Sequence, residues 1–118
     1  MKILVTGGAG FIGSNIANTL SRDKKATVVA FDDLSLGRPT NLSRDVKFVE
    51  GFNYGFRLTL EVVRGCDYII HSAAKSSSTM FKDDPRKGFM NVVESVKRNH
   101  VKKVIFASSS SVYNGPFH

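Results

Sequence analysis

The stretch ILVTGGAGFIGSNI at residues 3–16 decides the fold, because an apolar run leads into a loop with four glycines in seven positions. Within this loop Gly8, Gly10 and Gly13 spell G-x-G-x-x-G. A loop without side chains can turn tightly and can approach a ligand closely. The apolar residues that come after the loop recur at intervals of four, as on one face of a helix. The stretch therefore predicts a strand, a glycine turn and a helix that opens at the turn.

Strand and helix patterns alternate along the rest of the chain. Apolar, β-branched runs predict strands at residues 2–6, 26–32, 46–50, 68–74 and 104–107. Helical patterns lie at residues 13–22 and 56–64 and in the stretch 85–96. Strands that are apolar throughout and separated by helices are parallel strands covered on both faces. We therefore predict a Rossmann-type doubly wound α/β fold with about five strands and three helices.

Length, charge and cysteine content limit the class of protein. A chain of 118 residues is expected to form one domain. The net charge of +7 is spread over separate loops and helix ends and is not interleaved with aromatic residues, so no specific nucleic-acid partner is expected. No apolar run approaches the roughly 18 residues of a membrane span, so no membrane association is expected. The single cysteine, Cys66, fits a packed thiol in a cytoplasmic protein.

An acidic residue stands where a dinucleotide-binding fold needs one. Asp32 follows Gly13 by 19 residues and ends the second predicted strand. A carboxylate there accepts hydrogen bonds from the adenosine ribose hydroxyls and repels a 2′-phosphate, while the helix N-terminus faces the pyrophosphate. No Gly-Lys-Ser/Thr comes after the glycines, which argues against a P-loop nucleotidase. The pattern therefore predicts NAD as the cofactor.

Four segments together resemble the NAD-dependent epimerase/dehydratase family, the extended short-chain dehydrogenases: TGGAGFIGS, FDDLSLGRPTNL, HSAA and FASSSSVY. Within this family the likeness is to the amino-terminal part of nucleotide-sugar 4-epimerases of the UDP-galactose/UDP-glucose type. The resemblance implies that the intact enzyme acts on a nucleotide sugar, with a UDP-hexose as the expected substrate, through transient hydride transfer to NAD. Residues 1–118 are expected to be the NAD-binding domain, incomplete relative to the family and without its substrate domain.

The resemblance also assigns roles to individual residues. Those implied to contact the dinucleotide are Gly7, Gly10, Phe11, Ile12, Gly13, Asp32, Asp33, Leu34, Ser35, Gly37, Ser72, Ala73 and Ala74. Ser109 is the implied catalytic hydroxyl, with Ser110 as the alternative, although serines at a strand end can also be a merely polar terminus. His71 matches a histidine of the family, although a lone histidine that ends a buried strand is more often a core residue.

Beyond the serines, the sequence departs from the family. The family's catalytic base is the tyrosine of a Tyr-x-x-x-Lys motif, in which the lysine lowers the pKa of the tyrosine. None of the three tyrosines of this chain has a lysine four positions on, so the chain alone is expected to be inactive. A dinucleotide-binding, redox-sensing module of the same fold is the alternative function. The fifth predicted strand would form a sheet edge with an apolar face, for which a homodimer is expected.

Overall fold

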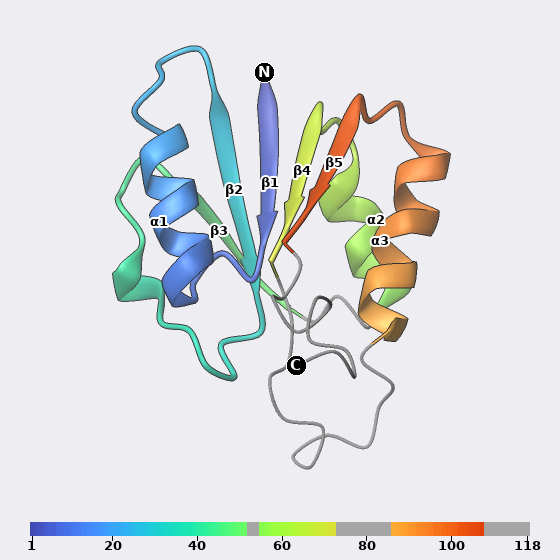
Figure 1. Cartoon of the computed structure of the whole chain (residues 1–118), viewed down its shortest axis with the longest axis horizontal. Helices are drawn as coiled ribbons and strands as arrows, with labels where there is room; N and C mark the ends of the chain where they lie inside the picture. Colours follow the sequence, from blue (N-terminus) through green and yellow to red (C-terminus); the bar gives the residue numbers. More distant parts are fainter. Residues whose placement is uncertain (52–54, 73–85, 108–118) are drawn as a thin grey trace, which may run out of the picture.

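The computed structural model describes residues 1–51, 55–72 and 86–107. In these residues the elements are β1 (Lys2–Thr6), α1 (Phe11–Leu20), β2 (Thr27–Asp32), the 3-10 turn η1 (Pro39–Asn41), β3 (Lys47–Glu50), α2 (Phe56–Val63), β4 (Tyr68–His71), α3 (Arg86–Arg98) and β5 (Lys103–Phe106). The strands form one parallel sheet in the order β3-β2-β1-β4-β5 (Figure 1). The strand order reverses between β1 and β4, which confirms the predicted Rossmann-type doubly wound sheet.

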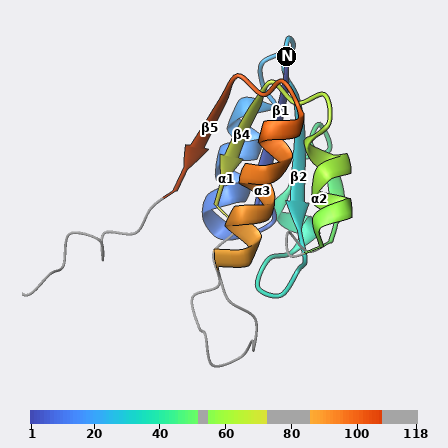
Figure 2. The same ribbon diagram turned by 90° about the vertical axis from the view of Figure 1, so that its right-hand side faces the viewer.

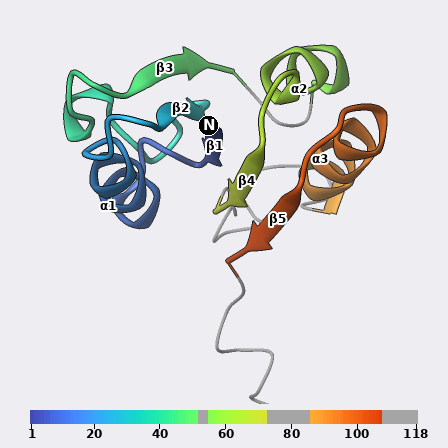
Figure 3. The same ribbon diagram turned by 90° about the horizontal axis from the view of Figure 1, so that it is seen from above.

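The helices cover the sheet from both sides. Figure 3 shows α1 on one face of the sheet, near β1 and β2, and α2 and α3 on the other face. Figure 2 shows α2 and α3 side by side in front of the strands. This arrangement follows from right-handed crossovers, because the chain moves in opposite directions along the sheet from β1 to β2 and from β4 to β5.

The two faces of β1 explain why this strand is apolar throughout. Successive side chains of a strand point to opposite faces. Leu4 packs in the core on the α2 and α3 side, whereas Ile3 and Val5 pack in the core on the α1 side. Each of the three is at most 5% exposed. Cys66 is also buried in the cluster around Leu4, which confirms the packed thiol that was expected from the sequence.

Several element boundaries differ from the sequence-based prediction, each by one to three residues. The first helix begins at Phe11 and not at residue 13, because Gly10 is its N-cap and the glycine motif runs into the first turn. β4 is assigned only as far as His71. β5 begins and ends one residue earlier than predicted, at Lys103–Phe106. Helix and strand ends depend on local hydrogen bonding, which the apolar pattern does not report.

The described helices are short. They contain 10, 8 and 13 residues, respectively, in α1, α2 and α3. A helix that spans a bilayer needs about 20 predominantly apolar residues. Within the described ranges, none of the helices has the length and apolar character to cross a membrane.

Candidate functional site

The loop between β1 and α1 is shaped by three of its glycines. Gly7 has a φ of +66°, in the left-handed region that favours glycine, and its N–H donates to the carbonyl of Phe31 at 2.7 Å. A Cβ atom at Gly8 would lie 2.5 Å from the Cβ of Ala30. A Cβ atom at Gly13 would lie 2.8 Å from the carbonyl carbon of Gly7 and would overlap its oxygen. The fold itself therefore accounts for these three glycines.

Gly10 is different, because the fold does not require a glycine there. Its φ of −76° and ψ of 179° describe extended backbone that any residue adopts. A Cβ atom at Gly10 would meet the carbonyl oxygen of Gly7 at 3.4 Å, which is an ordinary contact, and no other described atom within 4 Å. Neither conformation nor packing explains this glycine, so its bare backbone fits the close approach of a ligand.

The N-terminus of α1 lies at the carboxyl edge of the strands, next to Gly10 (Figure 1). The first N–H groups of a helix have no intrahelical acceptor, and they carry a partial positive charge. Gly10 provides no side-chain cap, and the first turn of α1, which lies within the described residues, holds no acidic residue. The side chains of Phe11 and Ile12 are 83% and 62% exposed. This helix end is therefore suited to an anionic ligand that also covers apolar surface.

Asp32 ties the end of β2 to the glycine loop. Its Oδ2 accepts the N–H of Ala9 and its Oδ1 accepts the N–H of Leu34, each at 2.9 Å. Leu34 has a φ of +64°, which is uncommon for a residue with a side chain. The Oδ1 of Asp33 accepts the N–H of Ser35 at 2.9 Å and tightens the same turn. An ionised carboxylate has about four acceptor positions, so Asp32 also has capacity for hydroxyl donors.

Gly37 brings the segment after β2 against the glycine loop. A Cβ atom at Gly37 would lie 2.5 Å from the carbonyl carbon of Ala9 and 2.8 Å from the nitrogen of Gly10. The two backbones are therefore in direct contact, and only glycine fits at this position. The glycine loop and the Asp32–Gly37 turn form one surface beyond the ends of β1 and β2.

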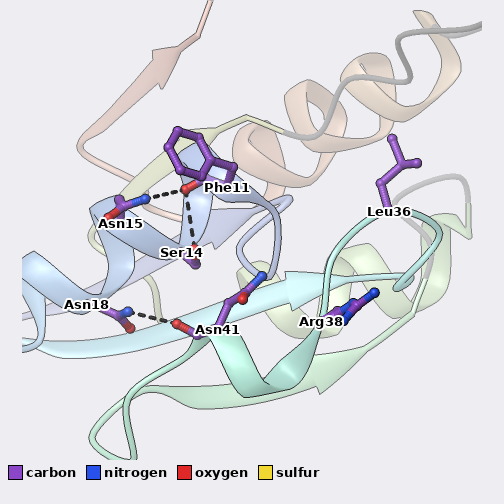
Figure 4. A pocket seen from close by; sticks show the side chains of 7 residues that line it. All are labelled: Phe11, Ser14, Asn15, Asn18, Leu36, Arg38 and Asn41. Carbon is purple, nitrogen blue, oxygen red and sulfur yellow. Dashed lines mark hydrogen bonds between the residues drawn. The ribbon is translucent and has the colours of Figure 1, made fainter.

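A pocket of about 550 Å³ lies between α1 and the segment after β2 (Figure 4). It is lined by Phe11, Ser14, Asn15, Asn18, Leu36, Arg38 and Asn41. Leu36 is 71% exposed, so this pocket has a second large apolar side chain in addition to that of Phe11. Apart from Phe11, these residues were not predicted from the sequence as site residues.

Hydrogen bonds also join the carboxyl ends of β1 and β4, where the strand order reverses. The hydroxyl of Thr6 lies 2.7 Å from the Nδ1 of His71. The N–H of Ser72 donates to the Thr6 hydroxyl at 3.2 Å, and the Ser72 hydroxyl donates to the Thr6 carbonyl at 2.5 Å. Ser72, one of the predicted cofactor contacts, is thus held at the edge of the sheet beside the glycine loop. Thr6 was missed by the sequence analysis, although a threonine directly before the glycine loop is a usable signal.

His71 lies in the protein core. It is 3% exposed, and its ring lies 5.6 Å from the rings of Phe89 and Phe106. Burial lowers the pKa of His71 to about 4, so the ring is neutral at pH 7. These contacts favour a core role for this histidine. Ala73, Ala74, Ser109 and Ser110 lie outside the described residues.

Comparison with known proteins identifies the family. The model for the NAD-dependent epimerase/dehydratase family matches residues 3–117. The chain belongs to this family. It is 37% identical over 130 residues to a UDP-glucose 4-epimerase from Mycolicibacterium smegmatis and 31% identical over 123 residues to UDP-glucuronic acid decarboxylase 6 from Arabidopsis thaliana. It also resembles the crystal structure of the Bifidobacterium longum UDP-glucose 4-epimerase in complex with NAD⁺ and UDP, with a TM-score of 0.86 and 28% identity.

These family members are much longer than the chain. The alignments cover 98% of this chain with both the M. smegmatis and the A. thaliana relative, and 41% and 36% of those proteins, respectively. The structural match covers 100% of this chain and 40% of the B. longum chain. The chain therefore spans about two fifths of the length of its family relatives, and it matches their amino-terminal part.

Proposed function

We propose that this chain is the NAD-binding part of a UDP-sugar epimerase. The observation that carries the proposal is Gly10, a glycine that the fold does not need, at the uncapped start of α1 and at the edge where Asp32 ends β2. This arrangement supports a dinucleotide whose pyrophosphate crosses the glycine loop and whose adenosine ribose lies at Asp32. The cofactor of the B. longum relative, NAD⁺, is of this kind.

Each group of residues at the carboxyl ends of β1 and β2 has a proposed role in binding the dinucleotide. The backbone of Gly10 and the first-turn N–H groups of α1 hold the pyrophosphate, with Phe11 and Ile12 beside it. The carboxylate of Asp32 accepts hydrogen bonds from the adenosine ribose hydroxyls. NAD held by these residues would supply the hydride acceptor for transient oxidation of the sugar. Ser109, or alternatively Ser110, is proposed to hydrogen-bond the sugar hydroxyl.

The proposed substrate of the intact enzyme is a UDP-hexose. The supporting observation is that relatives across the alignments carry names of UDP-sugar enzymes, although these include a decarboxylase as well as epimerases. The redox-sensing alternative requires dinucleotide binding without chemistry, and it shares the same glycine loop. No described residue favours that alternative over the enzyme.

Isothermal titration calorimetry on the full 118-residue chain tests the cofactor assignment. We expect NAD to bind roughly tenfold more tightly than NADP, because the carboxylate of Asp32 would repel the 2′-phosphate. The variant Asp32→Asn should lose this preference. The matched control Asp45→Asn, a change at an exposed carboxylate that is not among the implied cofactor contacts, should keep it.

Two results would overturn parts of the proposal. Equal affinity of the parent chain for NAD and NADP would remove the ribose role of Asp32. Failure of the folded chain to bind either dinucleotide would overturn the proposed function itself.

A further inference from the structure

The peptide groups of Ala9 connect the two loops of the proposed cofactor site. The residue is fully buried, and its N–H donates to Asp32. Its carbonyl oxygen accepts two hydrogen bonds from the segment after β2, one from the N–H of Arg38 at 3.0 Å and one from the Nδ2 of Asn41 at 2.9 Å. The position of Gly10, which comes directly after Ala9, therefore depends on the segment that contains Asn41.

Asn18 fixes this segment to α1. Its Nδ2 donates to the carbonyl of Asn41 at 2.9 Å, and its Oδ1 accepts the N–H of Ser43 at 2.9 Å (Figure 4 shows the first bond). An amide side chain offers a donor and an acceptor at the same time, and Asn18 uses both. The two asparagines thus form a clamp, defined as Asn18 and Asn41, that runs from α1 through the segment after β2 to the glycine loop.

We infer that the clamp of Asn18 and Asn41 positions the glycine loop and the Asp32–Gly37 turn for the dinucleotide. The inference rests on the proposed function, since it assumes that the dinucleotide crosses this surface. The segment between β2 and β3 contains no regular element except the three-residue turn η1, and among the described residues one backbone hydrogen bond, from Arg38 to Ala9, ties it to the glycine loop. Without the clamp, binding must also order this segment, and that lowers affinity.

The number of hydrogen bonds lost and the typical net strength of one bond set the expected size of the effect. Removal of the Asn41 side chain deletes one hydrogen bond to Ala9, and a typical net hydrogen bond changes an equilibrium by roughly three- to tenfold. We therefore expect Asn41→Ala to weaken NAD binding by about fivefold. The variant Asn18→Ala, which removes both bonds of this residue to the segment, should weaken NAD binding by a similar factor.

A matched set of variants separates the hydrogen bond of Asn41 from the packing of its side chain and from the effect of an added charge. The variant Asn41→Asp keeps the size of the side chain but replaces the donor by an acceptor that faces the carbonyl of Ala9, so it should bind NAD no better than Asn41→Ala. Asn15 lines the same pocket, but within the described residues its Nδ2 donates to the carbonyl of Phe11, inside α1, and to no atom of the segment after β2. The control variant Asn15→Ala should keep the parent affinity for NAD, and Asn15→Asp measures how much an added negative charge near the start of α1 weakens binding by itself.

The measurements are calorimetric affinity for NAD and amide hydrogen exchange of residues 33–38 in the free and NAD-saturated chain. We expect faster exchange of these amides in free Asn41→Ala than in the parent, with parent-like protection once NAD is saturating. If the parent binds NAD and both Asn41 variants bind NAD as tightly as the parent does, the positioning role is wrong and the proposed function stands. If the folded parent does not bind NAD, both inferences are overturned.

Discussion

The two halves of the sheet differ in how completely their α1-side face is covered. Around β1 and β2 this face is closed, because Val5, Val28 and Ala30 are each at most 1% exposed under α1. On β5, Ile105 pairs in register with Ile70 and shares its face, yet it is 52% exposed. Among the described residues, α1 thus covers this face in the half that carries the glycine loop, whereas the same face of β5 is left exposed. Binding of the dinucleotide and chemistry on the sugar are therefore expected to be separable.

The largest expected effect is the absence of turnover. The chain has no Tyr-x-x-x-Lys motif, and a positioned general base contributes about 10²- to 10⁴-fold to rate. Incubation of the purified chain with NAD and UDP-galactose should therefore yield no UDP-glucose, even if NAD binds. Turnover that survives purification and is lost in Ser109→Ala would show that the β4–β5 half is catalytically complete.

The next effect concerns the stability of the glycine-loop half. The variant Gly13→Ala places a Cβ atom against the backbone of Gly7, and overpacking of this kind costs about 3 kcal/mol in the free energy of unfolding. Urea unfolding followed by circular dichroism measures the loss. Gly10→Ala is the matched control and should lower the free energy of unfolding by only about 0.5 to 1 kcal/mol, the cost of a poorer helix N-cap. Equal losses in the two variants would mean that the glycines do not have different roles.

A pH-dependent effect is expected where the two halves meet, at His71. Its pKa falls from 6.5 to about 4 on folding, so the unfolded chain binds more protons between these values. The stabilisation is complete above pH 6.5 and is lost as the pH falls to 4, by about 3 kcal/mol.

Unfolding in urea at pH 7 and at pH 4 tests this prediction. The variant His71→Gln should lose less stability than the parent over this range, whereas His100→Gln, a change at an exposed histidine, should behave like the parent. An unchanged acid loss in His71→Gln would show that His71 is not the residue that titrates.

The smallest effect on stability is expected for substitution of Ile105, and this substitution should act mainly on self-association of the chain. We propose that the exposed apolar face of β5 mediates self-association of the chain. The variant Ile105→Lys should change the free energy of unfolding by less than about 0.5 kcal/mol and should reduce self-association in sedimentation velocity. Met90, which is 55% exposed on α3, provides the control Met90→Lys. Equal association of parent and Ile105→Lys chains would exclude this face as the interface.

The sequence predicted the fold because its signals are local. The apolar strands, the helical spacing and the glycine motif each lie within a short window, and together they allow one sheet topology. The contact between Ala9 and Asn41 joins residues 32 positions apart, and no local pattern reports it. The role of Asp32 in holding Ala9 was missed for the same reason. The predicted contacts of Ala73, Ala74, Ser109 and Ser110 lie outside the described residues and stay predictions.

The most direct test of the central claim is the affinity of Gly10→Val for NAD. The backbone at residue 10 is extended, which valine also adopts, and a Cβ atom there would meet only the carbonyl oxygen of Gly7, so the variant should stay folded and lose about 1 kcal/mol of stability because valine is a poorer N-cap. Its side chain would fill the space that the pyrophosphate needs, so titration calorimetry should detect no NAD binding to the variant under conditions in which the parent binds. A Gly10→Val chain that binds NAD as tightly as the parent would contradict the assignment of the glycine loop to the dinucleotide.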